Sequence, residues 1–180
     1  VVWAAGQLGR PVPAKVTGVD LVLNLAPRAE REGWRVFLLG GEPGVAEEAA
    51  ISLLTGFPRL SIAGTHHGFF AGGSPEELRV LSLIEERAPH LLLVARGSPR
   101  QEYWIREHLD AGRLMVPVSI GVGGVFDLLA GRVRRAPRWM LAWQLEWLWR
   151  LVQEPWRWRR MLALPRFVFL VWNAKTRRMR

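Results

Sequence analysis

The sequence has no cysteine among its 180 residues. Disulfides, thiolate metal sites and cysteine nucleophiles are therefore excluded, and the composition fits a reducing cytoplasm. The chain also lacks an apolar run of the roughly 18 residues that a membrane-spanning helix needs, and no signal-peptide pattern opens it. Serine nucleophile elbows, P-loops and HExxH motifs are absent as well, so the common hydrolase and nucleotide-triphosphatase signatures do not apply.

Positive charge is in excess, and the excess lies at one end of the chain. The net charge is +9, with 49% hydrophobic and 23% charged residues, as in globular proteins. Residues 132–180 carry thirteen Arg and Lys against two Glu, a net charge of +11, whereas residues 1–131 carry −2. Seven of the ten tryptophans lie in the same basic segment. This asymmetry predicts an anionic partner: nucleic acid, an anionic membrane surface or a phosphorylated substrate.

Residues 1–131 alternate short apolar runs with amphipathic stretches, which is typical of βαβ units. Strands are expected at 35–39, 60–64, 90–95 and 116–122. Helices are expected at 19–32, 45–55, 75–87 and 100–111, the third with Ser74 as N-cap, Pro75 at its first position and Glu77 completing a capping box. Because the apolar runs are nearly continuous, the strands should be buried on both faces. We therefore predict an α/β fold: a Rossmann-like open, mainly parallel sheet with flanking helices.

A change of pattern at residue 132 predicts a second domain. We expect a Rossmann-like domain over 1–131 and a basic, Trp-rich helical appendage over 132–180, with helices at 140–153, from Pro155 and from Pro165. Its tryptophans either pack on the sheet or face a partner, and apolar residues occupy more of the helix circumference than one packed face requires. Trp with Arg is typical of interfacial helices, but nucleic-acid binding uses the same chemistry, and composition does not separate the two.

Glycine-rich loops follow three of the expected strands: LLGGEPG (38–44), ARGSPRQE (95–102) and GVGGVFD (121–127). The carboxyl ends of parallel strands meet at one edge of the sheet, where ligands bind in such folds. Glycine turns also let backbone N–H groups approach a phosphate. Three such loops on one edge predict a nucleotide or nucleotide-sugar pocket that includes Gly40 and Gly41.

Several polar residues beside these loops have two interpretations. His66 and His67 are adjacent, and no histidine or acidic partner stands at a ligand spacing, so we expect no metal; a role in loop structure or a hydrogen bond to substrate is favoured. Asp127 either caps the next short helix or accepts a sugar hydroxyl. Gln101 and Glu102 begin a helix, where Glu is favoured by the helix dipole whatever its function.

The motifs GSPRQEYW (97–104), GVGGVFDLLAGRVRRAPRWM (121–140) and LEWLWRLVQEPWRWRRM (145–161) occur in this order. With them the chain resembles the WecG/TagA/CpsF glycosyltransferases, and KVTGVDLV, VFLLGGEPGVAEEAA and GTHHGFF extend the resemblance over nearly the whole chain. The resemblance implies an inverting transfer of N-acetylmannosamine or a related sugar, without metal or other cofactor. The donor would be a UDP-sugar and the acceptor a polyprenyl-diphosphate-linked GlcNAc, in teichoic acid or capsule synthesis.

The resemblance also implies residue roles. Gln101 and Glu102 match a PxQE motif at the sugar pocket, and Gly121, Gly123 and Asp127 match a motif near the UDP. Lys15 stands where many members carry Arg, which keeps the charge but loses bidentate geometry. The expected substrate-binding residues are Lys15, Gly40, Gly41, His67, Gln101, Glu102, Gly121, Gly123 and Asp127.

For the basic appendage the resemblance implies docking on an anionic membrane, at the inner face of the plasma membrane, and closure over the active site. Its expected diphosphate- or membrane-binding cations are Arg132, Arg134, Arg135, Arg138, Arg150, Arg157 and Arg160. No nucleic acid is then expected as a partner, and a homo-oligomer is left open.

The catalytic base is the one expected group that the sequence does not supply. The resemblance implies an Asp in an Asp-Gly motif just upstream of the segment similar to VVWAAGQLG, before Val1, whereas Asp20 matches a later motif. We therefore expect a truncated chain that binds UDP-sugar with little or no transfer. Two alternatives stay open: a non-catalytic remnant that binds UDP-sugar or membrane, and a basic nucleic-acid-binding module.

Overall fold

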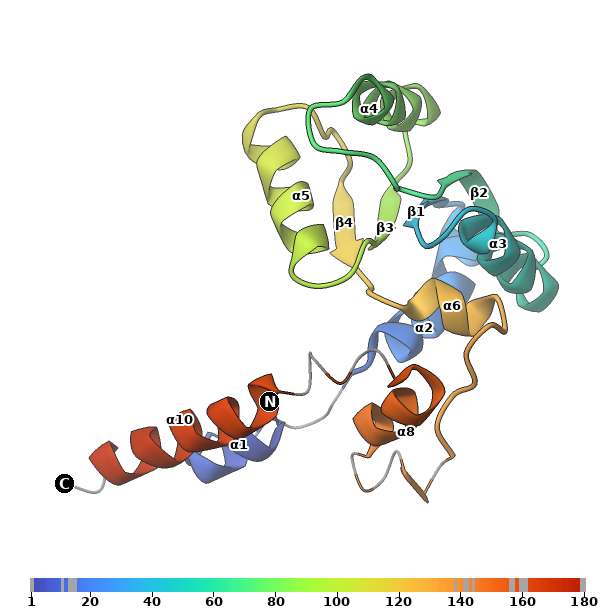
Figure 1. Cartoon of the computed structure of the whole chain (residues 1–180). Helices are drawn as coiled ribbons and strands as arrows, with labels where there is room; N and C mark the ends of the chain where they lie inside the picture. Colours follow the sequence, from blue (N-terminus) through green and yellow to red (C-terminus); the bar gives the residue numbers. More distant parts are fainter. Residues whose placement is uncertain are drawn as a thin grey trace. The chain divides into compact units, whose positions relative to one another are not determined.

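A computed structural model describes residues 2–10, 12, 16–137, 139, 140, 143, 145–155, 158 and 162–178 (Figure 1). The chain divides into two compact units. The sheet unit is Thr17–Arg134, and the terminal unit combines Val1–Val16 with Arg135–Arg180. The first sixteen residues thus group with the basic end of the chain. The division into 1–131 and 132–180 stays a prediction about domains.

The sheet unit is built on four parallel strands in the order β2-β1-β3-β4 (Figure 1). Their bounds are β1 Arg35–Gly40, β2 Ser61–His66, β3 Leu91–Ala95 and β4 Val118–Gly121. The predicted α/β class with a parallel sheet is therefore confirmed. The fourth strand is shorter than expected, since Pro117 has no N–H to donate to the ladder and the strand begins after it.

Helices cover both faces of the sheet (Figure 1). Those of the sheet unit are α2 Gly18–Glu32, α3 Val45–Gly56, α4 Pro75–Arg87, α5 Arg100–Asp110 and the short α6 Val125–Leu129. Val36 and Leu38 of β1 pack in one cluster with α2, α3 and α6, whereas Phe37 and Leu39 pack in the other with α4 and α5. Burial on alternating faces explains why nearly every residue of β1 is apolar.

At the start of α4 the predicted N-cap is present, but the predicted capping box is only partly formed. Ser74 is the N-cap, with Pro75 following, and its side chain accepts the N–H of Glu77 at 3.2 Å. The expected capping box is nevertheless only half present, because the Glu77 carboxylate accepts the N–H of Gly73 rather than that of Ser74. The carboxylate therefore reaches past the cap into the preceding loop.

The terminal unit contains α1 Val2–Gln7, α8 Glu146–Gln153 and α10 Ala163–Arg178, with α1 packed beside α10 (Figure 1). The helix expected at 140–153 is not continuous, although Trp139 and Met140 are helical. Trp143 and Leu145 lie in turns, the Leu145 N–H bonds the Met140 carbonyl at 2.8 Å, and α8 begins only at Glu146. Among the helices of the described residues, none is both long and apolar enough to cross a membrane.

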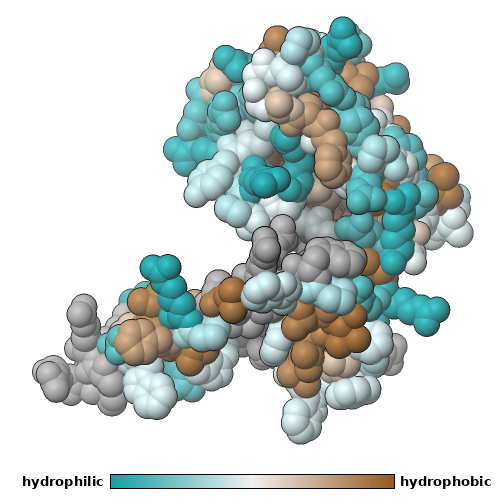
Figure 2. All heavy atoms as spheres, viewed as in Figure 1, coloured by the Kyte–Doolittle hydropathy of each residue, from teal (hydrophilic) through white to brown (hydrophobic). Residues whose placement is uncertain are grey.

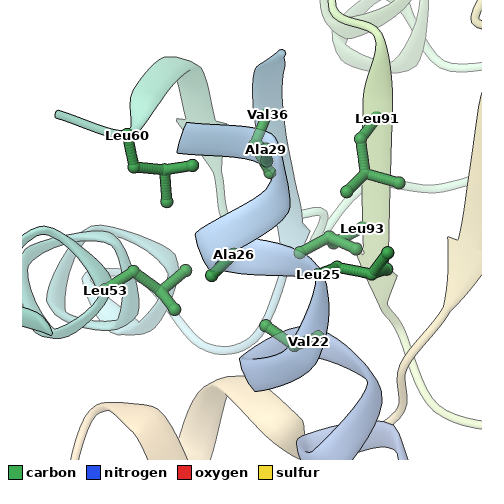
Figure 3. Close-up of a pocket in the computed structure, with 9 residues that line it drawn as sticks. All are labelled: Val22, Leu25, Ala26, Ala29, Val36, Leu53, Leu60, Leu91 and Leu93. Atoms are coloured by element: carbon green, nitrogen blue, oxygen red, sulfur yellow. The ribbon is translucent and has the colours of Figure 1, made fainter. Parts of the chain in front are cut away.

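A small gap lies between α2 and the sheet (Figure 3). Its volume is about 10 Å³, and its walls are the aliphatic side chains of Val22, Leu25, Ala26, Ala29, Val36, Leu53, Leu60, Leu91 and Leu93. A bound water needs roughly 10–15 Å³ together with polar partners. This gap is therefore a packing defect of the core and not a substrate site.

Replacing Gly64 of β2 with Ala should destabilise the sheet unit. Phe37 is fully buried, and a Cβ on Gly64 would lie 2.7 Å from its Cε2 atom. Forcing extra volume into a packed core costs roughly 1–3 kcal/mol. The free energy of unfolding in urea measures the loss. Gly56→Ala is the matched control, because a Cβ there meets nothing within 4 Å. Equal stability of the two variants would contradict the packing described.

Candidate functional site

The loop after β1 lies in direct backbone contact with the end of β3. The Gly41 N–H donates to the Ala95 carbonyl at 3.1 Å. Gly40 has φ +131°, and a Cβ there would collide with the Ala95 backbone. A Cβ on Gly68, in the loop after β2, would lie 3.2 Å from the Cα of Gly40. Three loops therefore meet at the carboxyl edge, and the two glycines expected to bind substrate are required by this packing alone.

Gln101 joins the start of α5 to the loop after β4. Its side chain is buried; Oε1 accepts the Gly123 N–H at 2.9 Å, and Nε2 donates to Oε1 of Glu102 at 2.9 Å. A Cβ on Gly121 would lie 2.6 Å from Nε2 of Gln101. The structure thus brings together four of the expected site residues. The Gln101 amide is used to fix the β4 loop, while Glu102 remains exposed at the surface.

The amino ends of α2 and α6 meet at the same loop. A Cβ on Gly18 would lie 3.0 Å from the Val122 carbonyl oxygen, so α2 begins directly against the β4 loop. Asp127 lies in the first turn of α6. Asp20 accepts a hydrogen bond from the hydroxyl of Thr17, the N-cap of α2, at 2.6 Å. Asp20 therefore takes part in the structure at the start of α2.

Arg132, expected to bind diphosphate or membrane, is paired with carboxylates of the sheet unit. Its Nε and one terminal nitrogen each donate to Glu48 at 3.0 Å, and its other terminal nitrogen lies 3.7 Å from Glu42. The hydrogen bond from Arg132 lowers the pKa of Glu48 against an opposing effect of burial. The guanidinium therefore links the segment after α6 to the start of α3.

The two histidines after β2 have an acidic neighbour after all. Glu76 Oε1 lies 3.6 Å from Nε2 of His67 and 4.0 Å from Nε2 of His66, an acidic neighbour that ligand spacing along the sequence does not indicate. The α4 start folds back over the loop, which local spacing does not reveal. Burial, and secondarily the neighbouring imidazole, lower the pKa of His66. A pocket of about 290 Å³ adjoins His66 and Glu76.

The hydrogen bonds of these histidines argue against a shared metal ion. Nδ1 of His66 accepts the Gly68 N–H at 3.1 Å, and Nδ1 of His67 accepts the Phe69 N–H at 3.0 Å. A neutral imidazole whose Nδ1 accepts must carry its proton on Nε2. Metal-binding histidines have the opposite arrangement, donating their second ring nitrogen to an acceptor. Both Nε2 atoms therefore carry a proton, and each lies within 4.0 Å of the Glu76 carboxylate, beyond direct hydrogen-bond distance.

Arg96 is a residue of this edge that sequence reasoning missed. One terminal nitrogen donates to the Phe70 carbonyl at 3.0 Å, and the guanidinium carbon lies 4.1 Å from the centre of the Phe70 ring. Burial lowers the pKa of this guanidinium, which stays protonated at neutral pH because its ordinary pKa is so high. The sequence does contain a signal for this residue, because Arg96 is a charged side chain that directly follows the apolar residues of the buried strand β3.

The remaining expected cations are only partly within the described residues. Lys15, Arg138, Arg157 and Arg160 lie outside the described residues. Arg134 belongs to the sheet unit, and Arg135 and Arg150 belong to the terminal unit. Their predicted roles at diphosphate or membrane stay predictions.

Large hydrophobic side chains are exposed on the terminal unit. Figure 2 shows hydrophobic residues over α8 and along α10. The exposed large hydrophobic residues of the described part of this unit are Trp3, Val12, Val16, Trp139, Trp143, Trp147, Leu148, Val152, Trp158, Leu162, Phe167, Val168, Phe169, Leu170 and Trp172. Exposed apolar patches usually mark protein or membrane interaction sites.

A parallel sheet covered on both faces, with glycine loops meeting at its carboxyl edge, defines a Rossmann-like α/β protein. The chain matches the Glycosyl transferase WecG/TagA/CpsF family over residues 1–180, and it belongs to that family. The expected family is therefore confirmed.

Two curated relatives are both called N-acetylglucosaminyldiphosphoundecaprenol N-acetyl-beta-D-mannosaminyltransferase. They come from Bacillus spizizenii strain W23 and Bacillus subtilis strain 168. Each is 34% identical to this chain over 173 residues, which is 95% of this chain and 64% of the relative. The chain thus spans just under two thirds of the length of these relatives.

Replacing Gln101 with Leu should loosen the β4 loop. The change leaves the partly buried Gly123 N–H without its acceptor, and because an unsatisfied donor costs about 1–3 kcal/mol when buried, a loss near the lower end of this range is expected. Urea unfolding measures the loss of stability. Glu107→Leu, at an exposed position of the same helix, is the control and should stay within about 0.5 kcal/mol of the wild type. A Gln101→Leu protein as stable as this control would mean that the amide does not fix the loop.

Proposed function

We propose that this chain is the donor-binding part of an inverting, metal-independent glycosyltransferase. It would move N-acetylmannosamine or a related sugar from a UDP-sugar to a polyprenyl-diphosphate-linked N-acetylglucosamine. Family membership and the names of the two relatives support the transfer of a hexosamine to a lipid-linked acceptor. The observation that carries the donor site is the meeting of the glycine loops at the carboxyl edge, around Gln101.

The donor would lie along this edge. In α/β sheets ligands bind outside the carboxyl ends of the strands, and backbone N–H groups there favour phosphate oxygens. The UDP would approach the loop that contains Gly121, Gly123 and Asp127. Glu102 would face the sugar, and His67 would donate from Nε2, the nitrogen that its hydrogen bond to Phe69 leaves protonated.

The chemistry needs an acid or cation for the leaving diphosphate and a base for the acceptor hydroxyl. Without a metal, backbone amides and arginines would stabilise the departing UDP. The tautomers of His66 and His67, which leave no ring nitrogen free to bind a metal ion, support a mechanism without metal. We assign the base to no described residue, and the carboxylate of Asp20 already accepts a hydrogen bond from the hydroxyl of Thr17.

The acceptor is lipid-linked, so the protein would work at a membrane surface. The exposed aromatic and aliphatic side chains of the terminal unit support insertion among lipid headgroups, where Trp and Arg are favoured. The net charge of +11 on residues 132–180 would favour anionic lipids. The protein would thus be peripheral on the inner face of the plasma membrane.

Titration calorimetry with UDP and with UDP-N-acetylmannosamine tests the donor site, with EDTA added to one arm. Binding is expected to be the same in both arms, since no metal is required. Transfer is tested with UDP-N-acetylmannosamine and a polyprenyl-diphosphate-GlcNAc acceptor, by UDP release and lipid extension. Binding without release would favour the non-catalytic alternative, and no binding in either arm would refute the proposal. Loss of binding with EDTA would refute metal independence.

Charge reversal in the tail should separate membrane docking from donor binding. Arg157, Arg159 and Arg160, which lie outside the described residues, are changed together to Glu. Each basic residue near an anionic surface contributes about 1 kcal/mol, so vesicle affinity should fall by at least about tenfold. Sedimentation with vesicles containing anionic lipid measures this, while calorimetry checks that UDP affinity is unchanged.

The control for this variant reverses the same charge elsewhere. Arg59, Arg87 and Arg113 are exposed residues of the sheet unit, and their replacement by Glu should leave vesicle binding almost unaltered. Equal losses in both triple variants would point to net charge alone. Loss of UDP affinity in the tail variant would mean either that these arginines contact the donor diphosphate or that the segment is part of the folded core.

A further inference from the structure

Glu77 is a buried carboxylate that the proposed reaction does not use. It lies in the first turn of α4, and only 4% of its surface is exposed. Three donors converge on it: the Gly73 N–H at 2.5 Å, the Trp104 indole N–H at 2.7 Å and Nε2 of His108 at 3.2 Å. The carboxylate therefore connects the loop before α4 to the helix α5 on the same face of the sheet.

The charge of Glu77 is what makes this arrangement stable. Burial is the largest influence and raises the pKa of the carboxyl, but the hydrogen bonds from Gly73, Trp104 and His108 together outweigh it and leave the pKa below its ordinary value. The group is thus ionised at neutral pH. Hydrogen bonds to an ionised acceptor are about twice as strong as neutral ones. Their loss would leave the indole N–H of Trp104 and Nε2 of His108 with no acceptor in a buried place.

Residues 67–74 are held at further backbone points, and together these define the His67 loop. His66 and His67 accept the N–H groups of the next residues but one, and Arg96 donates to the Phe70 carbonyl while stacking on the Phe70 ring. The Phe70 ring in turn lies 6.3 Å from that of Trp104, the same indole that donates to Glu77. Glu77 and Arg96 thus both contact the loop, and both lie beside Trp104.

We propose that Glu77 is a positioning residue that holds the His67 loop in place, so that the imidazole of His67 stays at the carboxyl edge where the donor would bind. The role of His67 at the donor rests on the proposed function. The role of Glu77 in holding the loop does not depend on it. No contact joins Glu77 to substrate in this scheme. It acts through the Gly73 N–H, and Trp104 and His108 fix its carboxylate.

A simple helix cap would have a different geometry. In a capping box the third-position carboxylate turns back to the N–H of the cap residue, here Ser74. The Ser74 N–H instead bonds the Ala71 carbonyl at 3.2 Å, and Glu77 passes it to reach Gly73. Gly73 has φ +74°, a conformation that suits glycine and directs its N–H at the carboxylate. The loop and the carboxylate are therefore matched to each other.

Glu77→Gln tests the inference, because it keeps the side-chain length but removes the charge. Hydrogen exchange, read by mass spectrometry over peptides that cover residues 67–74, should quicken by about tenfold or more, since hydrogen bonds to an ionised group are lost. Calorimetry should show UDP-sugar affinity several-fold weaker in protein that is still folded. In proton NMR the Trp104 indole N–H should move upfield as its bond to a carboxylate is lost. Glu86→Gln, exposed near the end of the same helix, is the control and should change none of the three.

Trp104→Phe is the second variant, for the case in which Glu77→Gln does not fold. It removes one donor while keeping the apolar ring, and a smaller change in the same direction is expected in exchange and affinity. Unchanged exchange over residues 67–74 in a folded variant would overturn the positioning role. Faster exchange with unchanged UDP-sugar affinity would limit Glu77 to a structural role. If the wild type binds no UDP-sugar, the proposed function fails, while the exchange result still decides whether Glu77 holds the loop.

Discussion

The contact between the backbones of β1 and β3 at their carboxyl ends is the constraint on which the candidate site depends. Adjacent parallel strands bring Gly40 against Ala95 so closely that no side chain fits between them. The loop after β2 also comes close, since a Cβ on Gly68 would lie 3.2 Å from the Cα of Gly40. The backbones of these loops therefore pack directly against one another where the strands end. A side chain at Gly40 would push β1 and β3 apart at the place where a phosphate is expected to approach.

Polar side chains then hold the loops that glycine allows to bend. Gln101 secures the loop after β4, Arg96 and Glu77 secure the loop after β2, and Arg132 joins the segment after α6 to α3. Each is a long side chain that bonds to backbone or to a carboxylate across the edge. Fixed dipoles of this kind need little reorganisation when charge arrives, which is the property required of a site that stabilises a leaving diphosphate. The edge is thus polar and at the same time well defined.

Much of the fold was predictable because burial dictates composition. The run RVFLL is apolar at consecutive positions since β1 has a helix layer on each face, and Ser74 with Pro75 marks the start of α4. The helix expected over 140–153 failed for a related reason. Apolar residues keep a helical spacing across Trp143 and Leu145, but the chain turns there, and periodicity does not encode a turn without glycine or proline. The strand β4 begins just after Pro117, and this shortening was not predicted from the sequence although the proline is visible there.

The sequence predicted where the site lies but not which side chains bond to one another there. Loops after parallel strands must share an edge, so the glycine motifs located it, whereas the partners of its side chains lie far away in sequence: Gln101 bonds a residue 22 positions on, and Arg132 one 84 positions back. Local spacing contains no information on such pairs. The Arg132 pair also limits what a diphosphate could gain there. A phosphate that recruits Arg132 must replace a two-point hydrogen bond to Glu48, so the net gain is smaller than an unpaired guanidinium would give. Binding strength at this edge should therefore come chiefly from backbone N–H groups, and Arg132 would contribute to selectivity for ligands able to compete with a carboxylate.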